Sequence, residues 1–370
     1  MITLLEKALE LLNIFEENGY EAYIVGGFVR DYVLKIKSND VDLCTNATPM
    51  EMKKIFKNVN LPFKGYGSIS LTYKKVNFEI TTYRMEFEYN NKRTPSKILY
   101  TNSLLIDLKR RDFTINTLCM NSKGEIIDLL NSSGDIGNKI IRMVGDPYKK
   151  TRDDALRILR AVRFATILDF NIEKSLCDAI INNASLLNNL SYFRKKQELN
   201  KIFSSINALK GIELLKRFGL DKYLDINLDK KIVNTSDPLG IWLQVAPSSK
   251  YQFTNNEKEY MNAILAILKD KKINDMEIYL NGSYVCYIAA QILNIDEKDI
   301  YDRFDNLPIK NKSEIEIKPV EIIKLLKKDK TFMIKKIIKD LEEKIVNRIL
   351  ENKREVLEKY IIETYKDIMI

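Results

Sequence analysis

The sequence predicts an α+β protein, in which an N-terminal part carries a mixed, mainly antiparallel sheet of about five strands and the rest of the chain is helical. Strand-like segments with alternating apolar residues lie between residues 20 and 129. From about residue 171 to the end, apolar residues recur at helical spacing instead. The chain has only 13 Gly and 8 Pro in 370 residues, so long flexible linkers are not expected, and its length suits two or three domains.

Composition limits the chemistry that the chain can perform. The formal net charge is +9 and the pI is about 9.0, which favours a polyanionic partner. The sequence contains no histidine, which excludes Ser-His triads, histidine general bases and His/Asp metal hydrolase modules. Its four cysteines are scattered and form no Cys-x-x-Cys pair, so we expect neither a zinc site nor a disulfide framework. Catalysis must therefore rest on carboxylates, cations and metal.

The first helix is expected over residues 1–18, where apolar side chains recur on one face. This segment lacks the basic region and apolar core of a signal peptide. The longest apolar run, near residues 284–293, is too short to cross a bilayer. Together with the cysteine pattern, these features predict a cytoplasmic protein with no membrane partner.

A phosphate-binding turn beside two carboxylates is predicted near the N-terminus. A buried strand over residues 20–25 ends at Gly26 and Gly27, and a helix with Arg30 in its first turn follows. Such a turn presents backbone N–H groups to an anion. Asp40 and Asp42 then project to one face of a second short strand, where they suit divalent metal ions on a nucleoside triphosphate. This combination resembles the first motif of the DNA polymerase beta superfamily of nucleotidyltransferases.

The next segments complete the predicted sheet and cover the site. A helix capped by Thr48 runs to about residue 58, and strands follow over residues 68–74 and 76–83. Glu79 is either an exposed strand residue or a third carboxylate near the aspartates, and we favour the second interpretation. The polar segment 84–102 is expected to be a mobile loop over the site.

Residues 107–129 supply further candidates for nucleotide binding. Arg111 and Asp112 could reach a phosphate and a ribose hydroxyl, although the run of charges is also compatible with a solvated helix face. A hairpin is expected over residues 116–129, with a turn at Gly124 and a structural role for Asp128.

The most informative helix is predicted over residues 151–167. Its apolar side chains form a core face, and Asp154, Arg157 and Arg160 follow an i, i+3 ridge on the other side. Arg163 continues this row towards the apolar edge. The ridge could be a surface ion pair worth a few tenths of a kcal/mol. We favour a second interpretation, in which an acceptor and donors together pair with the edge of a nucleobase.

With these segments together, the chain resembles the class II tRNA nucleotidyltransferases, the CCA-adding enzymes. The matching segments occur in family order over residues 20–165. They are Gly26 to Asp31, Asp40 to Asp42, Glu79 to Arg84, Arg93 with Pro95, Arg110 to Asn116, and Asp153 to Phe164.

The resemblance implies template-independent addition of CCA to the 3′ end of tRNA from CTP and ATP, with pyrophosphate released by two-metal nucleotidyl transfer. It implies that Asp40 and Asp42 hold Mg²⁺ and, with Glu79, form the catalytic centre. The implied nucleotide-binding residues are Gly26, Gly27, Arg30, Arg111, Asp112, Asp154, Arg157, Arg160 and Arg163. Of these, Asp154 and Arg157 are implied to read the incoming base.

The resemblance also implies four parts: a head over residues 1–145, a neck over 146–220, a body over 221–310 and a tRNA-binding tail over 311–370. A homodimer is compatible with it. Phe193 departs from the family pattern, since a glutamate normally precedes Arg194 there.

Three other functions share parts of this pattern. They are a poly(A) polymerase, an enzyme that adds only the CC or only the final A, and a non-catalytic RNA-binding protein. CC-only addition is disfavoured because the segment 85–102 is intact, and loss of catalysis is disfavoured because both aspartates are present.

Overall fold

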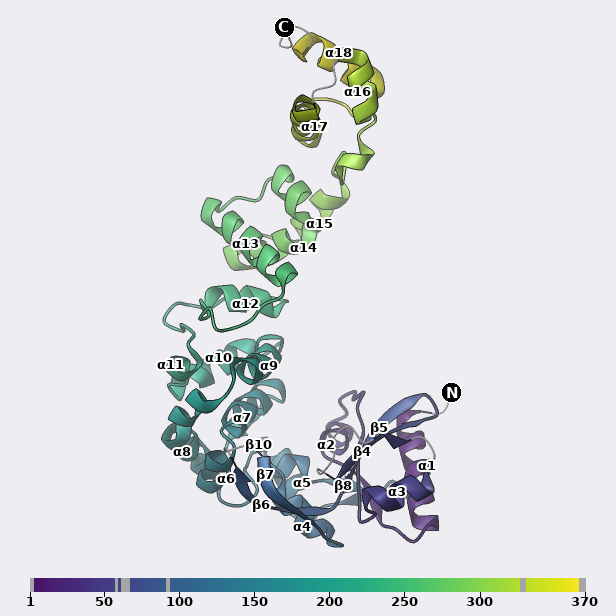
Figure 1. Ribbon diagram of the computed structural model, residues 1–370. Coiled ribbons are helices and arrows are strands. Elements are labelled where there is room, and N and C mark those ends of the chain that lie inside the picture. Colours follow the sequence, from purple (N-terminus) through teal and green to yellow (C-terminus); the bar gives the residue numbers. More distant parts are fainter. Residues whose placement is uncertain (1–2, 57–58, 61–66, 91–93, 327–330, 366–370) are drawn as a thin grey trace. The chain divides into compact units, whose positions relative to one another are not determined.

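The computed structural model describes residues 3–56, 59–60, 67–90, 94–326 and 331–365. The chain divides into two compact units, Met1–Ile226 and Asn227–Ile370. Figure 1 shows the sheet and its flanking helices in the first unit, whereas the second unit is helical. The finer division into head, neck, body and tail stays a prediction.

A mixed sheet forms the N-terminal part of the first unit. Its seven strands lie in the order β3-β4-β5-β2-β1-β8-β9, and every neighbouring pair is antiparallel except β2 with β5. The strands are β1 (Ala22–Val25), β2 (Asp42–Thr45), β3 (Val59–Asn60), β4 (Ser68–Tyr73), β5 (Val76–Thr82), β8 (Cys119–Met120) and β9 (Ile126–Ile127). The predicted mixed, mainly antiparallel sheet is confirmed. The hairpin predicted over residues 116–129 is present as β8 and β9. The strand that the sequence did not predict is β3, whose two residues are too few to show a period.

Helices with clear end signals pack around this sheet. The first, α1 (Leu4–Glu17), starts at a capping box of Thr3 and Glu6 and buries four apolar side chains. Its Phe15 meets Phe56, which follows α3 (Pro49–Ile55), with the ring centroids 5.3 Å apart. The remaining helices of this part are α2 (Gly27–Val33), α4 (Leu104–Arg110), η1 (Thr114–Asn116) and α5 (Ser132–Gly137).

The segment predicted as a mobile loop is a β-hairpin instead. Strands β6 (Arg84–Asn90) and β7 (Thr94–Tyr100) pair antiparallel in a two-stranded sheet, and residues 91–93 between them lie outside the described residues. Pro95 is compatible with this ribbon because proline is tolerated on edge strands. The loop prediction was wrong because it relied on the polar composition of the segment and did not use the alternation of apolar and polar residues over 84–90, which is typical of a strand.

The helical part of the first unit follows the sheet. It contains α6 (Pro147–Asp153), α7 (Leu156–Ile167), α8 (Lys174–Asn183), η2 (Ala184–Asn189), α9 (Tyr192–Phe203), α10 (Ala208–Arg217), α11 (Asp221–Leu224) and a parallel pair of short strands, β10 (Ile140–Ile141) and β11 (Asn171–Ile172). The single helix predicted over residues 151–167 is broken at Asp154, which has extended backbone angles. Its carboxylate accepts the N–H of Leu156 at 3.0 Å and so caps the start of α7.

The second unit consists of helices packed around a core of isoleucines, leucines and alanines. These helices are α12 (Pro238–Gln244), α13 (Asn255–Asp270), α14 (Asp275–Leu293), α15 (Glu297–Asp305), η3 (Lys312–Glu314), α16 (Pro319–Leu326), α17 (Thr331–Val346) and α18 (Arg354–Tyr365). The helical prediction is confirmed for this part. Among the described residues, no helix combines the length and apolarity needed to cross a bilayer.

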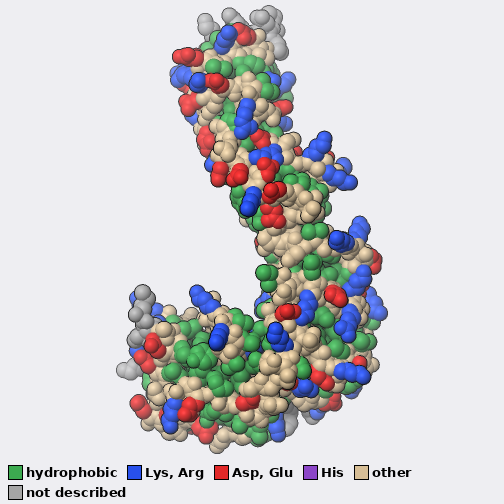
Figure 2. Space-filling model, turned by 180° about the vertical axis from the view of Figure 1, so that it is seen from behind, with side chains coloured by type: hydrophobic (Ala, Val, Ile, Leu, Met, Phe, Trp, Pro, Cys, Tyr) green, Lys and Arg blue, Asp and Glu red, His purple; other side chains and the backbone are tan. Residues whose placement is uncertain are grey.

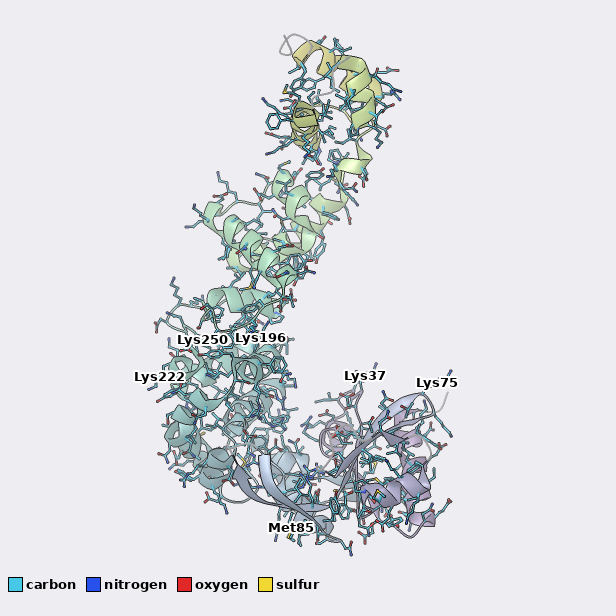
Figure 3. The ribbon with its side chains drawn as sticks, viewed as in Figure 1. Lys37, Lys75, Met85, Lys196, Lys222 and Lys250 are labelled. Carbon is cyan, nitrogen blue, oxygen red and sulfur yellow. The ribbon has the colours of Figure 1, made fainter. Side chains whose placement is uncertain are left out.

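Basic side chains are spread over both units. Lys37 and Lys75 project from the sheet-bearing part of the first unit, and Lys196 and Lys222 from its helical part (Figure 3). On the face that Figure 2 shows, Lys and Arg side chains are interspersed with Asp and Glu. A basic composition alone therefore does not locate a binding surface.

Close packing between α7, α9 and α10 gives a test of this arrangement. A Cβ atom on Gly211 would lie 2.4 Å from Ile202 Cγ2 and 2.7 Å from Thr166 Oγ1, and both of these neighbours are fully buried. We expect Gly211→Ala to lower the free energy of unfolding by about 1–3 kcal/mol, measured by urea denaturation. Gly137→Ala is the control, because a Cβ there meets nothing within 4 Å. Equal stability of the two variants would contradict the packing of α10.

Candidate active site

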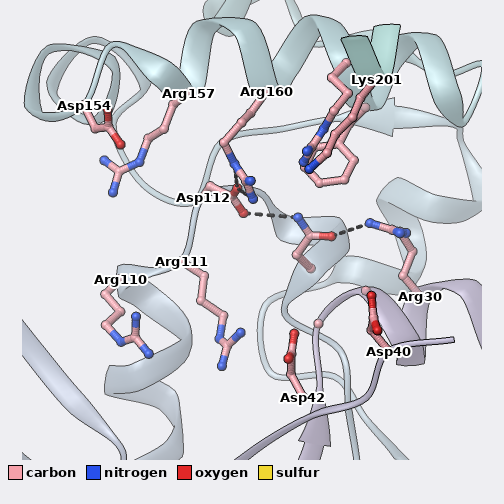
Figure 4. Close-up of a pocket in the computed structure, with 15 residues that line it drawn as sticks. Arg30, Asp40, Asp42, Arg110, Arg111, Asp112, Asp154, Arg157, Arg160 and Lys201 are labelled. Carbon is pink, nitrogen blue, oxygen red and sulfur yellow. Dashed lines mark hydrogen bonds and ion pairs between the residues drawn. The ribbon is translucent and has the colours of Figure 1, made fainter. Parts of the chain in front are cut away.

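A polar pocket of about 570 Å³ lies in the first unit, where the sheet meets the helical part. Figure 4 shows Asp40 and Asp42 on one wall, and Asp154, Arg157, Arg160 and Lys201 along the opposite wall. The lining residues are Gly26, Gly27, Arg30, Asp40, Asp42, Arg110, Arg111, Asp112, Asn116, Asp154, Arg157, Arg160, Arg163, Phe164 and Lys201. Every predicted site residue except Glu79 therefore lines one pocket.

The glycine turn between β1 and α2 forms one edge of the pocket. Gly26 has a φ of +82°, a conformation that favours glycine, and its N–H donates to the carbonyl of Leu118. One turn into α2, the Arg30 side chain is buried and pairs with Asp31 at 2.7 Å. The turn thus brings a glycine backbone and a held guanidinium to the same edge.

The two aspartates enter the pocket at the start of β2. The strand begins at Asp42, so Asp40 lies just before it and not on it as predicted. The alternation nevertheless holds, because both aspartates are exposed and Val41 between them is buried. Among the described residues, neither carboxylate accepts a hydrogen bond or joins an ion pair.

Glu79 lies beside this pair but outside the pocket lining. It is directly opposite Asp42 in the parallel pairing of β2 with β5, and its side chain is exposed. Desolvation by the pocket walls raises the pKa of Asp42, and the nearby carboxylates of Glu79 and Asp40 raise it further. The positive charge of Arg111 partly offsets this increase. Within the described residues, no group of three or more Asp, Glu, His or Cys side chains is arranged to hold a metal ion alone.

A buried carboxylate from α4 positions two arginines of the pocket. Asp107 is fully buried and accepts from Arg110 Nε at 2.8 Å and from Arg111 Nη2 at 3.2 Å. It also accepts the backbone N–H of Arg84 at the start of β6. Sequence analysis assigned no role to this residue, which links the base of the hairpin to the pocket.

A continuous chain of polar contacts crosses the pocket from α2 to α7. Arg30 Nη1 donates to Asn116 at 2.7 Å, and the Asn116 amide donates to Asp112 at 3.1 Å. On the other side, Arg160 Nε donates to Asp112 at 2.7 Å (Figure 4). Burial alone would raise the pKa of Asp112, but the Arg160 charge and its hydrogen bonds hold it at about 2.

The far wall comes from the region between α6 and α7 and from α9. Asp154 meets Arg194 at 3.5 Å, and Arg157 is buried with its Nη1 donating to the carbonyl of Lys150. Phe193, which departs from the family pattern, is 70% exposed. The break at Asp154 places its carboxylate at the pocket end of α7 and not along the helix ridge.

Arg163 is constrained by a buried ion pair and by stacking on an aromatic ring. Its guanidinium lies in a buried pair with Glu198 at 3.3 Å and stacks 4.4 Å from the ring centroid of Phe164. Burial and the neighbouring Arg160 lower the pKa of Arg163 to about 10. Arg30 and Arg160 contact the same ring from 5.2 and 5.4 Å, so three cations gather around one aromatic side chain.

Sequence analysis missed four residues that line the pocket: Arg110, Asn116, Phe164 and Lys201. The first three lie inside the recognised segments. Lys201 does not, although its i+7 spacing from Arg194 on α9 could have indicated it.

Comparisons with known proteins identify the family of the chain. Family models match the poly A polymerase head domain over residues 22–142, a probable RNA- and SrmB-binding site of polymerase A over 169–227, and a putative tRNA nucleotidyltransferase domain 2 over 249–361. The chain is 33% identical to the CCA-adding enzyme of Ligilactobacillus salivarius, covering 95% of each chain. The chain belongs to the family of CCA-adding enzymes.

The chain is also similar over nearly its full length to other members of this nucleotidyltransferase family. The CCA-adding enzyme of Bacillus subtilis is 31% identical, over 96% of this chain and 97% of its own length. The crystal structure of the Bacillus stearothermophilus CCA-adding enzyme in complex with CTP has a TM-score of 0.85 and 27% identity, covering 100% of this chain and 99% of that chain. The fold of a CCA-adding enzyme therefore extends over both units.

The ion pair of Asp112 gives a test that depends on pH. Asp112→Asn should lower the free energy of unfolding at pH 7 by roughly 1–3 kcal/mol, because it leaves Arg160 without its partner. The pKa of Asp112 is lower in the folded protein than in the unfolded chain, so its contribution is complete above about pH 4 and is lost as pH falls towards 2. Urea denaturation between pH 7 and pH 3 measures this difference.

Asp169→Asn is the matched control, since it removes a carboxylate from an exposed pair with Lys210. A stability loss for Asp112→Asn that stays constant down to pH 3 would contradict the assignment.

Proposed function

We propose that this chain adds C, C and A to the 3′ end of tRNA, using CTP and ATP and releasing pyrophosphate. The observation that carries the proposal is the pocket itself. It joins a glycine turn, two carboxylates that have no partner among the described residues, and the side chains of Asp154 and Arg157. The CTP-bound relative of the same fold supports the choice of nucleotide. The relatives named CCA-adding enzymes support the choice of product.

The polar chain across the pocket suggests how the nucleotide is held. Asp154 and Arg157 offer an acceptor and a donor side by side and read the base. Asp112 and Arg160, already fixed to each other, hold the ribose and a phosphate, while Arg30 and Arg111 bind the rest of the triphosphate. Because Asn116 ties Asp112 to Arg30, the base and phosphate ends keep a fixed separation.

Asp40 and Asp42 are the residues that would hold a divalent ion, which we infer to be magnesium. Both carboxylates face the pocket without partners in the described part of the chain. The surrounding pocket walls desolvate the Asp42 carboxylate and, with the neighbouring carboxylates, raise its pKa. An oxygen-only donor set of this kind suits Mg²⁺ with substrate phosphates as further ligands. The bound ion would neutralise charge that develops on the phosphates.

The two-ion arrangement, a third-carboxylate role for Glu79, a homodimer and a cytoplasmic location stay predictions.

Poly(A) synthesis is the second candidate, since the head matches a poly A polymerase domain. It would require the same pocket to accept ATP repeatedly without a stop. The full-length likeness to CCA-adding enzymes favours the first candidate.

Incorporation into three tRNA transcripts separates these functions. The transcripts end before CCA, after C and after CC, and CTP and ATP are offered singly and together with magnesium. We expect stepwise addition of C, C and A followed by a stop. A long adenosine ladder would establish a poly(A) polymerase, and A alone on the CC-ended transcript an A-adding enzyme. No incorporation would favour a non-catalytic RNA-binding protein.

Asp42→Asn and Asp40→Asn should each lower the incorporation rate by roughly a thousandfold or more, because the divalent ion loses a ligand. Thermal unfolding should be unchanged or slightly higher for Asp42→Asn, since a repulsive carboxylate is removed. Glu17→Gln, on the exposed face of α1, is the control. Magnesium affinity, measured by titration calorimetry with CTP present, should fall with the rate. Normal incorporation by either variant would refute the metal assignment.

A further inference from the structure

Lys201 is a cation of the pocket that belongs to none of the recognised family segments. It lies on α9, and its side chain lines the same pocket as Phe164 and Arg163. Figure 4 shows Lys201 and Asp154 at opposite ends of the same wall, with Arg157 and Arg160 between them. Lys201 is therefore remote from the end where Asp154 offers its carboxylate to a base.

The neighbouring arginines are already paired, whereas Lys201 is not. Arg30 pairs with Asp31, Arg160 with Asp112 and Arg163 with Glu198. In the described part of the chain, Lys201 forms neither an ion pair nor a hydrogen bond. Its ammonium group is thus available to a ligand without breaking an existing contact.

One row of α9 directs side chains to the pocket wall formed by α7. Arg194, Glu198 and Lys201 follow i+4 and i+3 spacing, so they lie on one face of the helix. The first contacts Asp154 just before α7, and the second contacts Arg163 within α7. Lys201 continues this row beyond Arg163, towards the end of the pocket that holds Arg30.

Positive charge accumulates at that end. The guanidinium groups of Arg30, Arg160 and Arg163 surround the ring of Phe164, and Lys201 lines the pocket next to them. Each of these arginines is matched by its own carboxylate, so Lys201 is the cation that adds uncompensated charge at this end among the described residues. An anion with more than one charge is the ligand that this arrangement favours.

We propose that Lys201 binds the outer phosphates of the incoming nucleoside triphosphate and is a phosphate-binding residue of this enzyme. This inference rests on the proposed function and adds a contact from α9 to it. The nucleotide would then be held from the glycine turn, from α7 and from α9 together. The RNA end also carries a phosphate, and the experiment separates these two sources.

The test compares Lys201→Gln with wild type in titration calorimetry with magnesium, using CTP and CMP as probes and no RNA. We expect roughly tenfold weaker CTP binding, the loss of one charge-assisted hydrogen bond, and CMP binding within about twofold of wild type. Lys201→Arg should restore CTP binding to within about threefold, because the charge is kept. Lys216→Gln, an exposed lysine of α10 outside the pocket, is the matched control.

In the incorporation assay, the KM for CTP and ATP should rise for Lys201→Gln while the KM for the tRNA transcript stays unchanged. Unchanged CTP affinity with a raised KM for the transcript would overturn the proposal and assign Lys201 to the RNA. Equal weakening of CTP and CMP would overturn it as well, since the contact would not involve the outer phosphates. If wild type binds CTP but adds nothing to the transcripts, the proposed function fails while the phosphate contact stands or falls on the CTP and CMP data alone.

Discussion

The contact between Asp112 and Arg160 is the interaction on which the candidate site depends. It joins the loop after α4 to α7, and through Asn116 it extends to Arg30 beside the glycine turn. The carboxylate keeps its charge because the guanidinium outweighs the cost of burial, which is why the pKa of Asp112 is about 2. This ion pair thereby joins the wall formed by α7 to the wall that carries the glycine turn.

Around this contact, the pocket contains two kinds of charged side chain: those paired with another residue and those without a partner among the described residues. Most of its arginines have a carboxylate neighbour, and Asp107 serves two of them. The cost of burying those guanidinium groups is offset within the protein. Asp40, Asp42 and Lys201 remain without partners among the described residues, and they face each other across the cavity. We propose that a metal ion and the phosphate groups of the substrate are the partners of these side chains.

Two local features of the backbone determine how these side chains are oriented. The break between α6 and α7 frees Asp154 from the helix, so that its carboxylate both caps α7 and reaches Arg194. The hairpin of β6 and β7 starts at Arg84, whose N–H donates to the same Asp107 that orients Arg110 and Arg111. The base of the hairpin is therefore linked through Asp107 to both arginines of the pocket.

The sequence by itself determined the α+β class, the mixed sheet and the helical remainder, and its motifs, with the family resemblance they carry, named most of the residues that line the pocket. These depend on local signals: apolar period, glycine turns, capping residues and charged residues at short spacing. Only the tertiary structure decided that segment 84–102 is a hairpin, that Glu79 lies outside the lining and that Lys201 lies inside it. The reason is physical, since cross-strand pairing and the packing of α9 on α7 join residues far apart in the chain, and no local pattern encodes their distance.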